Sequence, residues 1–156
     1  MVDALDATSR ALEIVLKALS LYPIEAVLLD GVTYAGFNIV NPFAIHALTG
    51  VGIIVAFRYP LDLSKVARAL IKHFKDWRLR LATICNVYSR ARVIEFDNGT
   101  KIMVSCIGIP RDPCIELVKR LTVWKPNPEP LRIADLIASA MGRKIFEKRM
   151  NVAMSG

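Results

Sequence analysis

Apolar residues recur along the first half of the chain in two patterns, one typical of buried strands and one of amphipathic helices. Continuous apolar runs at Ile24–Leu29 and Ile53–Phe57 predict strands that are buried on both faces, as in parallel sheets. Apolar positions near helical spacing predict helices before, between and after these strands. The expected helices span Asp6–Leu21, Pro42–Leu48 and Leu63–Phe74. Because a helix joins the two strands, we expect the strands to be parallel and adjacent.

The pattern changes after residue 85. Two segments, Ala91–Asp97 and Lys101–Ile107, flank Asn98-Gly99, which predicts a β-hairpin with a type I′ turn. Prolines fill the segment Lys125–Pro130, which we expect to be extended. Further helices are expected at Pro113–Leu121 and Leu131–Lys148. This order of elements predicts one α/β domain over residues 1–156.

Composition narrows the class of protein. With 54% hydrophobic and 22% charged residues, the chain is globular rather than disordered. No apolar run approaches the length that spans a bilayer, so no membrane association is expected, and the acidic, polar start is not a signal peptide. Cys85, Cys106 and Cys114 are odd in number and lack zinc-ligand spacing. We therefore expect small buried thiols in a reducing, cytoplasmic compartment.

The net charge of +7 favours a polyanionic partner such as nucleic acid. The basic residues are spread along the chain, but they are denser at Lys72–Arg80 and Arg143–Arg149. Such runs can line a nucleic-acid groove. They are more often solvated faces of helices, and we favour that interpretation for both segments.

One carboxylate stands out, because Asp30 ends the first predicted strand and is followed at once by Gly31. Ligands in open α/β sheets gather outside the carboxyl ends of the strands, so Asp30 is placed to hold a metal or a substrate. The alternative is a turn residue, since Asp-Gly is a common turn pair. Tyr34 and Phe37 lie in the following loop, where they can stack on a nucleic-acid base or pack under the loop as a lid.

Several sequence words resemble a known family. LDGVTYAGFN, GIIVAFRYP, HFKDW and NPEPLRIADLIAS, in this order, look like uncharacterised protein family 0215, also called domain of unknown function 99. This largely archaeal group is similar to endonuclease V, and the resemblance covers nearly the whole chain. It implies a ribonuclease H-like mixed sheet flanked by helices, with an added β-hairpin.

The resemblance also implies a reaction, the two-metal hydrolysis of phosphodiester bonds with Mg²⁺ or Mn²⁺. Asp30 matches the acid that ends the fourth strand of the endonuclease. Arg58 falls where that enzyme has a catalytic lysine, and Asp135 where it has a final acid or histidine on the last helix. Asp3 is the best match for its glutamate, with Asp6 as the alternate. These matches imply that Asp30, Arg58 and Asp135 are catalytic and that Asp3, Asp30 and Asp135 hold metal.

Each of these assignments has a structural alternative. Asp135 is spaced to pair with Arg132 along one helix, an interpretation equal in weight to the site. Arg132 can instead hold Glu129, which we expect to cap the last helix rather than to act in catalysis. Asp3 and Asp6 are expected to charge and cap the first helix more readily than to bind metal.

In the related fold, three strands and a first catalytic aspartate precede the segment VDALDAT. We therefore expect the chain as given to lack those strands and to be catalytically incompetent, through an upstream start of the reading frame or a genuine deletion. Their loss would expose one edge of the strand Ile24–Leu29, and exposed edges invite pairing with another chain, so a homodimer is expected. Two functions stay open: a metal-dependent nuclease, and a non-catalytic nucleic-acid-binding or assembly protein.

Overall fold

A four-stranded mixed sheet organises the structure, a computed structural model that describes residues 3–154 and side chains as far as residue 143. The strands lie in the order β1-β4-β6-β5. Strands β1 and β4 are parallel and adjacent, as predicted, while β4–β6 and β6–β5 are antiparallel. The α/β class expected from the sequence is confirmed. The strands are β1 (Ala26–Asp30), β4 (Gly52–Phe57), β5 (Arg92–Glu95) and β6 (Lys101–Ile107), with a separate antiparallel pair β2 (Thr33–Tyr34) and β3 (Asn38–Ile39).

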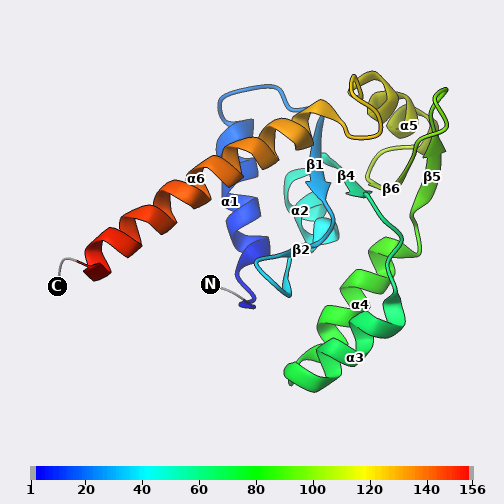
Figure 1. The fold of residues 1–156 in the computed structure, drawn as a ribbon. Coiled ribbons are helices and arrows are strands. Elements are labelled where there is room, and N and C mark those ends of the chain that lie inside the picture. Colours follow the sequence, from blue (N-terminus) through cyan, green and yellow to red (C-terminus); the bar gives the residue numbers. More distant parts are fainter. Residues whose placement is uncertain (1–2, 155–156) are drawn as a thin grey trace.

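Helices cover both faces of this sheet (Figure 1). Helices α1 to α4 pack on one face against Ile53, Val55 and Phe57, and α5 with the start of α6 packs on the other against Ile54 and Ala56. Every residue of β4 is buried, which explains why its sequence is continuously apolar. The helices are α1 (Ala7–Leu19), α2 (Pro42–Thr49), α3 (Leu63–His73), α4 (Trp77–Tyr88), α5 (Arg111–Arg120) and α6 (Glu129–Met154).

The predicted hairpin is confirmed as the antiparallel pair β5–β6, which ends at Glu95 opposite Lys101. Its turn differs from the expectation. Gly99 has a positive φ of 78°, but Asn98 is not among the residues with positive φ, so the turn is not type I′. The connection is a longer loop, closed by hydrogen bonds from the Phe96 N–H to the Thr100 carbonyl and from the Gly99 N–H to the Phe96 carbonyl.

Helix α4 has no counterpart among the elements predicted from sequence. Its buried positions are Arg80, Ile84 and Val87, which follow helical spacing. The first of the three, Arg80, is a charged residue with 5% of its surface exposed. It interrupts the row of apolar residues by which an amphipathic helix is recognised in a sequence. Arg80 also corrects our interpretation of the basic run Lys72–Arg80, because this side chain lies inside the protein and not on a solvated face.

The sequence predicts that the proline-rich segment before α6 is extended. In the structure this segment forms turns instead. It contains a cis peptide bond between Lys125 and Pro126, and the Asn127 N–H donates to the Trp124 carbonyl at 3.2 Å. Helix α6 then begins at Glu129, two residues before the expected start, and projects from the body of the molecule (Figure 1). Within the described part of the chain, no helix is both long and apolar enough to cross a bilayer.

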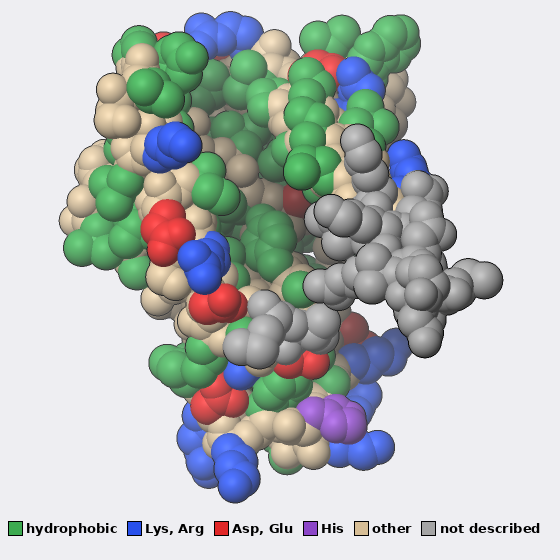
Figure 2. Space-filling model, turned by 90° about the vertical axis from the view of Figure 1, so that its left-hand side faces the viewer, with side chains coloured by type: hydrophobic (Ala, Val, Ile, Leu, Met, Phe, Trp, Pro, Cys, Tyr) green, Lys and Arg blue, Asp and Glu red, His purple; other side chains and the backbone are tan. Residues whose placement is uncertain are grey.

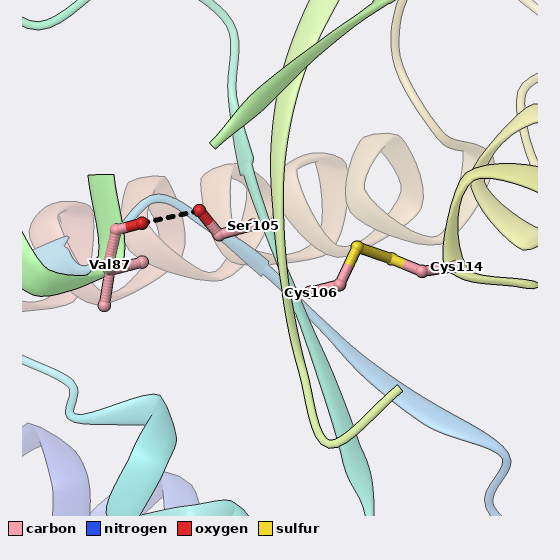
Figure 3. Close-up of a disulfide and its surroundings, with 4 residues drawn as sticks. All are labelled: Val87, Ser105, Cys106 and Cys114. Atoms are coloured by element: carbon pink, nitrogen blue, oxygen red, sulfur yellow. Dashed lines mark hydrogen bonds between the residues drawn. A yellow bond between two sulfur atoms is a disulfide. The ribbon is translucent and has the colours of Figure 1, made fainter. Parts of the chain in front are cut away.

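Two of the three cysteines are joined, which corrects the expectation of three thiols. Cys106 on β6 and Cys114 on α5 form a disulfide, while Cys85 is free. Figure 3 shows why this pairing suits the sheet, since Ser105 and Cys106 point to opposite sides of β6. The Ser105 hydroxyl donates to the Val87 carbonyl of α4 at 2.6 Å, and Cys106 reaches α5. Neighbouring residues thus attach β6 to both helical layers.

Candidate active site

The candidate site begins where the two parallel strands end. Asp30 is the last residue of β1 and is paired in register with Ala56 of β4. The Gly31 N–H still donates to the Ala56 carbonyl at 2.8 Å, and Gly31 then turns the chain away with a φ of 72°. A side chain would be strained at that backbone angle, which explains the glycine. Asp30 is therefore fixed at the carboxyl edge of the sheet, as predicted.

Arg58 follows β4 at the same edge and contacts Asp30. Its Nη2 lies 2.5 Å from the Asp30 Oδ2, and the two side chains are 36% and 38% exposed. Ion pairs this accessible stabilise a fold by about 1 kcal/mol or less. The significance of the pair is therefore its position: an anion-binding guanidinium is held beside a carboxylate, with both reachable from solvent.

Tyr34 belongs to the short strand β2, which follows Asp30 in the chain. Its ring packs against the core on the α1–α4 face of the sheet. Burial first, and then the negative charge of Asp30, raise the pKa of Tyr34 to about 12. The phenol consequently stays protonated near neutral pH and keeps an O–H group close to Asp30.

Asp135 of α6 lines the same pocket as Asp30 and Tyr34. The pocket has a volume of about 420 Å³, and its other lining residues are Leu28, Thr33, Ala35, Leu131, Ala134 and Ala138. The pocket thus lies between the end of β1 and the exposed beginning of α6. Figure 2 views the molecule from the side toward which α6 projects and shows a hollow with hydrophobic side chains on both walls.

Asp3 lies outside this pocket and holds the loop that follows β2. Its Oδ1 accepts a hydrogen bond from the Phe37 N–H at 2.7 Å, and its own N–H donates to the Ala35 carbonyl at 2.9 Å. Asp6 accepts from the Asn38 side chain at 2.8 Å, and this bond keeps the pKa of Asp6 below its usual value. Both carboxylates tie the N-terminal segment to the loop. Asp6 is also the residue before α1, although its side chain makes no capping hydrogen bond.

Phe37 takes the second of the two arrangements considered for the loop aromatics. Its ring meets that of Phe74 edge-on, with centroids 5.7 Å apart, and packs against the core.

Arg132 pairs with Glu129 and not with Asp135. Arg132 Nη2 lies 2.7 Å from Glu129 Oε2, and this contact lowers the pKa of the Glu129 carboxyl. Asp135 forms no ion pair among the described residues, so its carboxylate is available to the pocket.

The carboxylates of Asp30 and Asp135 are the acidic side chains that this pocket offers to a metal ion. Mg²⁺ and Mn²⁺ take hard oxygen ligands, and two-metal centres gather several carboxylates. The described residues contain no group of three or more His, Cys, Asp and Glu side chains arranged to hold a metal. Asp30 and Asp135 alone do not satisfy a two-metal centre.

Residues 1–142 match the model of a family described as endonuclease dU. The chain belongs to the endonuclease dU family. Among its relatives is a UPF0215 protein of Methanothermobacter thermautotrophicus, 35% identical over 141 residues, which are 90% of this chain and 67% of the relative. A UPF0215 protein of Pyrococcus furiosus is 32% identical over 142 residues, or 91% of this chain and 71% of that protein. The resemblance to uncharacterised protein family 0215 is thereby confirmed.

A solved structure shares this architecture. It is the crystal structure of a protein of unknown function from Archaeoglobus fulgidus, with a TM-score of 0.75 and 26% sequence identity. The match covers 90% of this chain and 78% of the other.

In this member of the endonuclease dU family, the sequence did not reveal the small residues that line the pocket of Asp30 and Asp135. Thr33 and Ala35 come from the loop, and Ala134 and Ala138 lie one turn apart on α6. A signal was present, because Ala134 precedes Asp135 and Ala138 lies three residues after it, in a helix that also carries large apolar side chains. Small side chains leave space beside a carboxylate, but that meaning is visible only once α6 is placed against β1.

Proposed function

We propose that this member of the endonuclease dU family hydrolyses phosphodiester bonds in nucleic acid, on a ribonuclease H-like fold, at the pocket shared by Asp30 and Asp135. The observation that carries the proposal is the family match over residues 1–142, which includes Asp30, Arg58 and Asp135. The geometry supports it, since two of these side chains line one pocket and the third pairs with Asp30. The family description names dU, so DNA that contains deoxyuridine is the proposed substrate.

The side chains suit distinct roles in this reaction. Arg58 offers the planar fork of donors that binds phosphate oxygens, and it would exchange part of its contact with Asp30 for the substrate. The protonated Tyr34 can donate a hydrogen bond to a phosphate oxygen. Asp30 and Asp135 can orient a water molecule and accept its proton as its oxygen attacks phosphorus and the ester P–O bond breaks. The proton needed by the leaving oxygen returns from the solvent.

The carboxylates also suit a weakly held cation. We propose that Asp30 and Asp135 bind one Mg²⁺ or Mn²⁺ ion, which would polarise a phosphate oxygen when bound. A ligand that binds only the folded protein raises its melting temperature by mass action. Manganese should therefore stabilise the wild-type protein at millimolar concentration and leave the Asp30→Asn variant unchanged. Equal shifts for the two proteins would contradict the cation site.

Cleavage of deoxyuridine-containing oligonucleotides tests the main proposal. Products with the wild-type chain would refute the expectation, drawn from the sequence, that the chain as given is catalytically incompetent. In that case we expect a loss of at least about tenfold with Asp30→Asn or Asp135→Asn, because each removes one proton acceptor. Glu116→Gln on α5 is the matched control, since it makes the same chemical change at an exposed position outside the pocket. Equal rates for all three variants would place the activity elsewhere.

The alternative function is nucleic-acid binding without cleavage. It is favoured by one observation, the lack of a third acidic ligand near Asp30 and Asp135 among the described residues. Binding that is the same for wild type and Asp30→Asn, with no cleavage by either and with divalent cations present, would establish this alternative.

We also propose that two copies associate along β1. This strand pairs on one side with β4 and ends the sheet, so its other edge offers hydrogen-bonding groups that a second β1 can meet in antiparallel order. Apolar side chains of α6 beside this edge extend the contact; they are Ile133, Leu136, Ile137 and Met141, each about half exposed. Light scattering should show a dimer that Ile137→Glu dissociates. A wild-type chain that stays monomeric at all concentrations would refute this association.

A further inference from the structure

A second pocket lies at the opposite edge of the sheet from β1, where β5 begins. It has a volume of about 260 Å³ and lies between the end of α4, strand β6 and the start of α5. Its lining residues are Ser89, Arg90, Arg92, Val104, Cys106, Ile109, Arg111 and Ile115. The arginines are exposed and Val104 is buried, so a cationic rim surrounds an apolar floor. Pockets for drug-sized ligands begin at about 300 Å³, so this one suits a smaller group.

The charge of the rim is not compensated within the described part of the chain. No carboxylate lines the pocket, and none of its three arginines forms an ion pair there. Five other arginines do pair with carboxylates, namely Arg10, Arg58, Arg80, Arg120 and Arg132. Like charges around one small space repel each other, and a bound anion would remove that repulsion.

Neutral groups hold two of these arginines in place. Arg92 Nη1 donates to the Ala91 carbonyl at 2.9 Å and approaches the Ser89 carbonyl at 3.4 Å. The Arg90 guanidinium lies 5.3 Å from the centroid of the Phe43 ring. The Arg92 contacts involve uncharged groups only, so its positive charge is left for a ligand. The Arg90 guanidinium lies against Phe43 of α2, which packs on the opposite face of the sheet, so this side chain has to turn to reach a ligand in the pocket.

The third arginine stands at the start of a helix. Arg111 is the first residue of α5, and no side chain caps this end of the helix. The first turn of α5 offers the N–H groups of Arg111 and Asp112 only, because Pro113 has none, and the helix dipole also favours an anion at this end. Asp112 lies in the same turn but does not line the pocket. The disulfide between Cys106 and Cys114 ties this end of α5 to β6, so the wall that carries Arg111 is fixed to the floor.

The register of the sheet relates this pocket to the candidate active site. Asp30 pairs with Ala56, Ala56 with Val104, and Val104 with Arg92. Residues directly opposite each other in a sheet point to the same face, so Asp30 and Arg92 share the face covered by α5 and α6. Three strand spacings of about 4.8 Å separate them by about 14 Å, which corresponds to the axial rise of about four nucleotides along one strand of a B-form duplex at about 3.4 Å each.

We infer that Arg90, Arg92 and Arg111 form a binding site for a backbone phosphate of the nucleic acid whose cleavage is proposed at Asp30. The inference rests on the proposed function for the identity of the ligand. Arg90, Arg92 and Arg111 supply the guanidinium groups, and the apolar floor accepts the adjoining sugar or base. The site adds affinity and fixes the register of the strand, and it takes no part in bond breaking.

Binding of a fluorescent single-stranded DNA, followed by anisotropy at several salt concentrations, tests this site. The Asp30→Asn background prevents cleavage during the measurement. Each phosphate contact contributes about 0.7 to the salt slope of single-strand binding, so Arg90→Ala combined with Arg111→Ala, which removes one phosphate contact, should lower the slope by about 0.7. Affinity should fall roughly tenfold or more at low salt. Arg68→Ala combined with Arg78→Ala is the matched control, because it removes the same charge from exposed positions on α3 and α4.

The outcomes separate this inference from the proposed function. If the pocket variant binds like the control variant while the wild-type chain still cleaves DNA, the phosphate site is wrong and the active-site proposal survives. If the pocket variant loses affinity but no protein cleaves DNA, the phosphate site stands without the nuclease. Inorganic phosphate should compete with DNA for the Asp30→Asn protein more strongly than chloride at equal ionic strength. A lack of such competition would also contradict the site.

Discussion

Replacing the buried Arg80 with methionine should destabilise the protein far more than replacing any one exposed or half-exposed arginine. Arg80 Nε bonds both oxygens of Asp76 at 3.0 and 3.1 Å, and Nη1 donates to the carbonyls of Ala4 and Phe37. The guanidinium also lies 4.4 Å from the centroid of the Phe74 ring. One side chain thus joins the N-terminal segment, the loop after β2 and the start of α4.

The magnitude follows from the two carbonyls. An acceptor that loses its partner inside a protein costs about 1–3 kcal/mol, and both carbonyls here are part-buried, so Arg80→Met should lower the free energy of unfolding by about 3 kcal/mol. For a chain of 156 residues this corresponds to a fall in melting temperature of roughly 6–12 °C. Arg78→Met is the control. Its guanidinium lies over the Trp77 ring at 4.4 Å in an exposed position, and such a contact contributes about 1 kcal/mol or less.

The contribution of Asp76 adds a pH dependence. Its hydrogen bond with Arg80 lowers the pKa of Asp76 in the folded state from the ordinary value of 3.8. A lowered folded-state pKa stabilises the fold above the unfolded-state pKa, and this stabilisation is lost as the pH falls through the folded-state value. Urea titrations of both variants at pH 7 and at pH 3 measure these effects. The difference between wild type and Arg80→Met should narrow at the lower pH. Equal stabilities of Arg80→Met and Arg78→Met at pH 7 would refute the central role of Arg80.

Three further outcomes follow from other contacts. Reduction of the Cys106–Cys114 disulfide, whose partners are eight residues apart, should lower stability by about 2.5 kcal/mol in denaturant titrations, whereas an unchanged midpoint would show that the cross-link contributes nothing. Asn41→Ala removes the acceptor of the Phe43 and Ala44 N–H groups at the start of α2, so it should cost about 1 kcal/mol, while Asn41→Asp should cost less. Tyr34 should not ionise below pH 11 in ultraviolet titrations, and Asp30→Asn should shift its titration to lower pH because one cause of the raised pKa is removed.

The sequence predicted most of the elements that bury a regular apolar pattern. Strand β4 is continuously apolar because both of its faces are covered, and the signal was unambiguous. Helix α4 was missed because Arg80 occupies a buried position, and its burial depends on carbonyls from residues far away in the chain. The pairing of Cys106 with Cys114 was also missed. Spacing of cysteines does not show that one lies on a strand facing the helix that carries the other.

The candidate site was predictable to a similar extent. The end of the first strand located Asp30, whereas Arg58 came from the resemblance to a family; the structure brings them together because the ends of adjacent parallel strands meet at one edge. Only the resemblance to a family indicated Asp135, whose helix gives no local sign of where it packs. The arginines of the second pocket escaped notice because they come from three separate elements, and the sequence shows them as dispersed charges.

Asp30 lies on β1, which is an edge strand of the sheet, and this location has a consequence for local order. Strand β1 is supported by hydrogen bonds from β4 on one side, so opening it requires fewer broken bonds than opening β4. Local unfolding free energies vary across a protein in this way, and the backbone amides of β1 should exchange with solvent earlier than those of β4. Anything that pairs with the free edge of β1 would slow that exchange. It would thereby order the carboxylate of the candidate site without touching it.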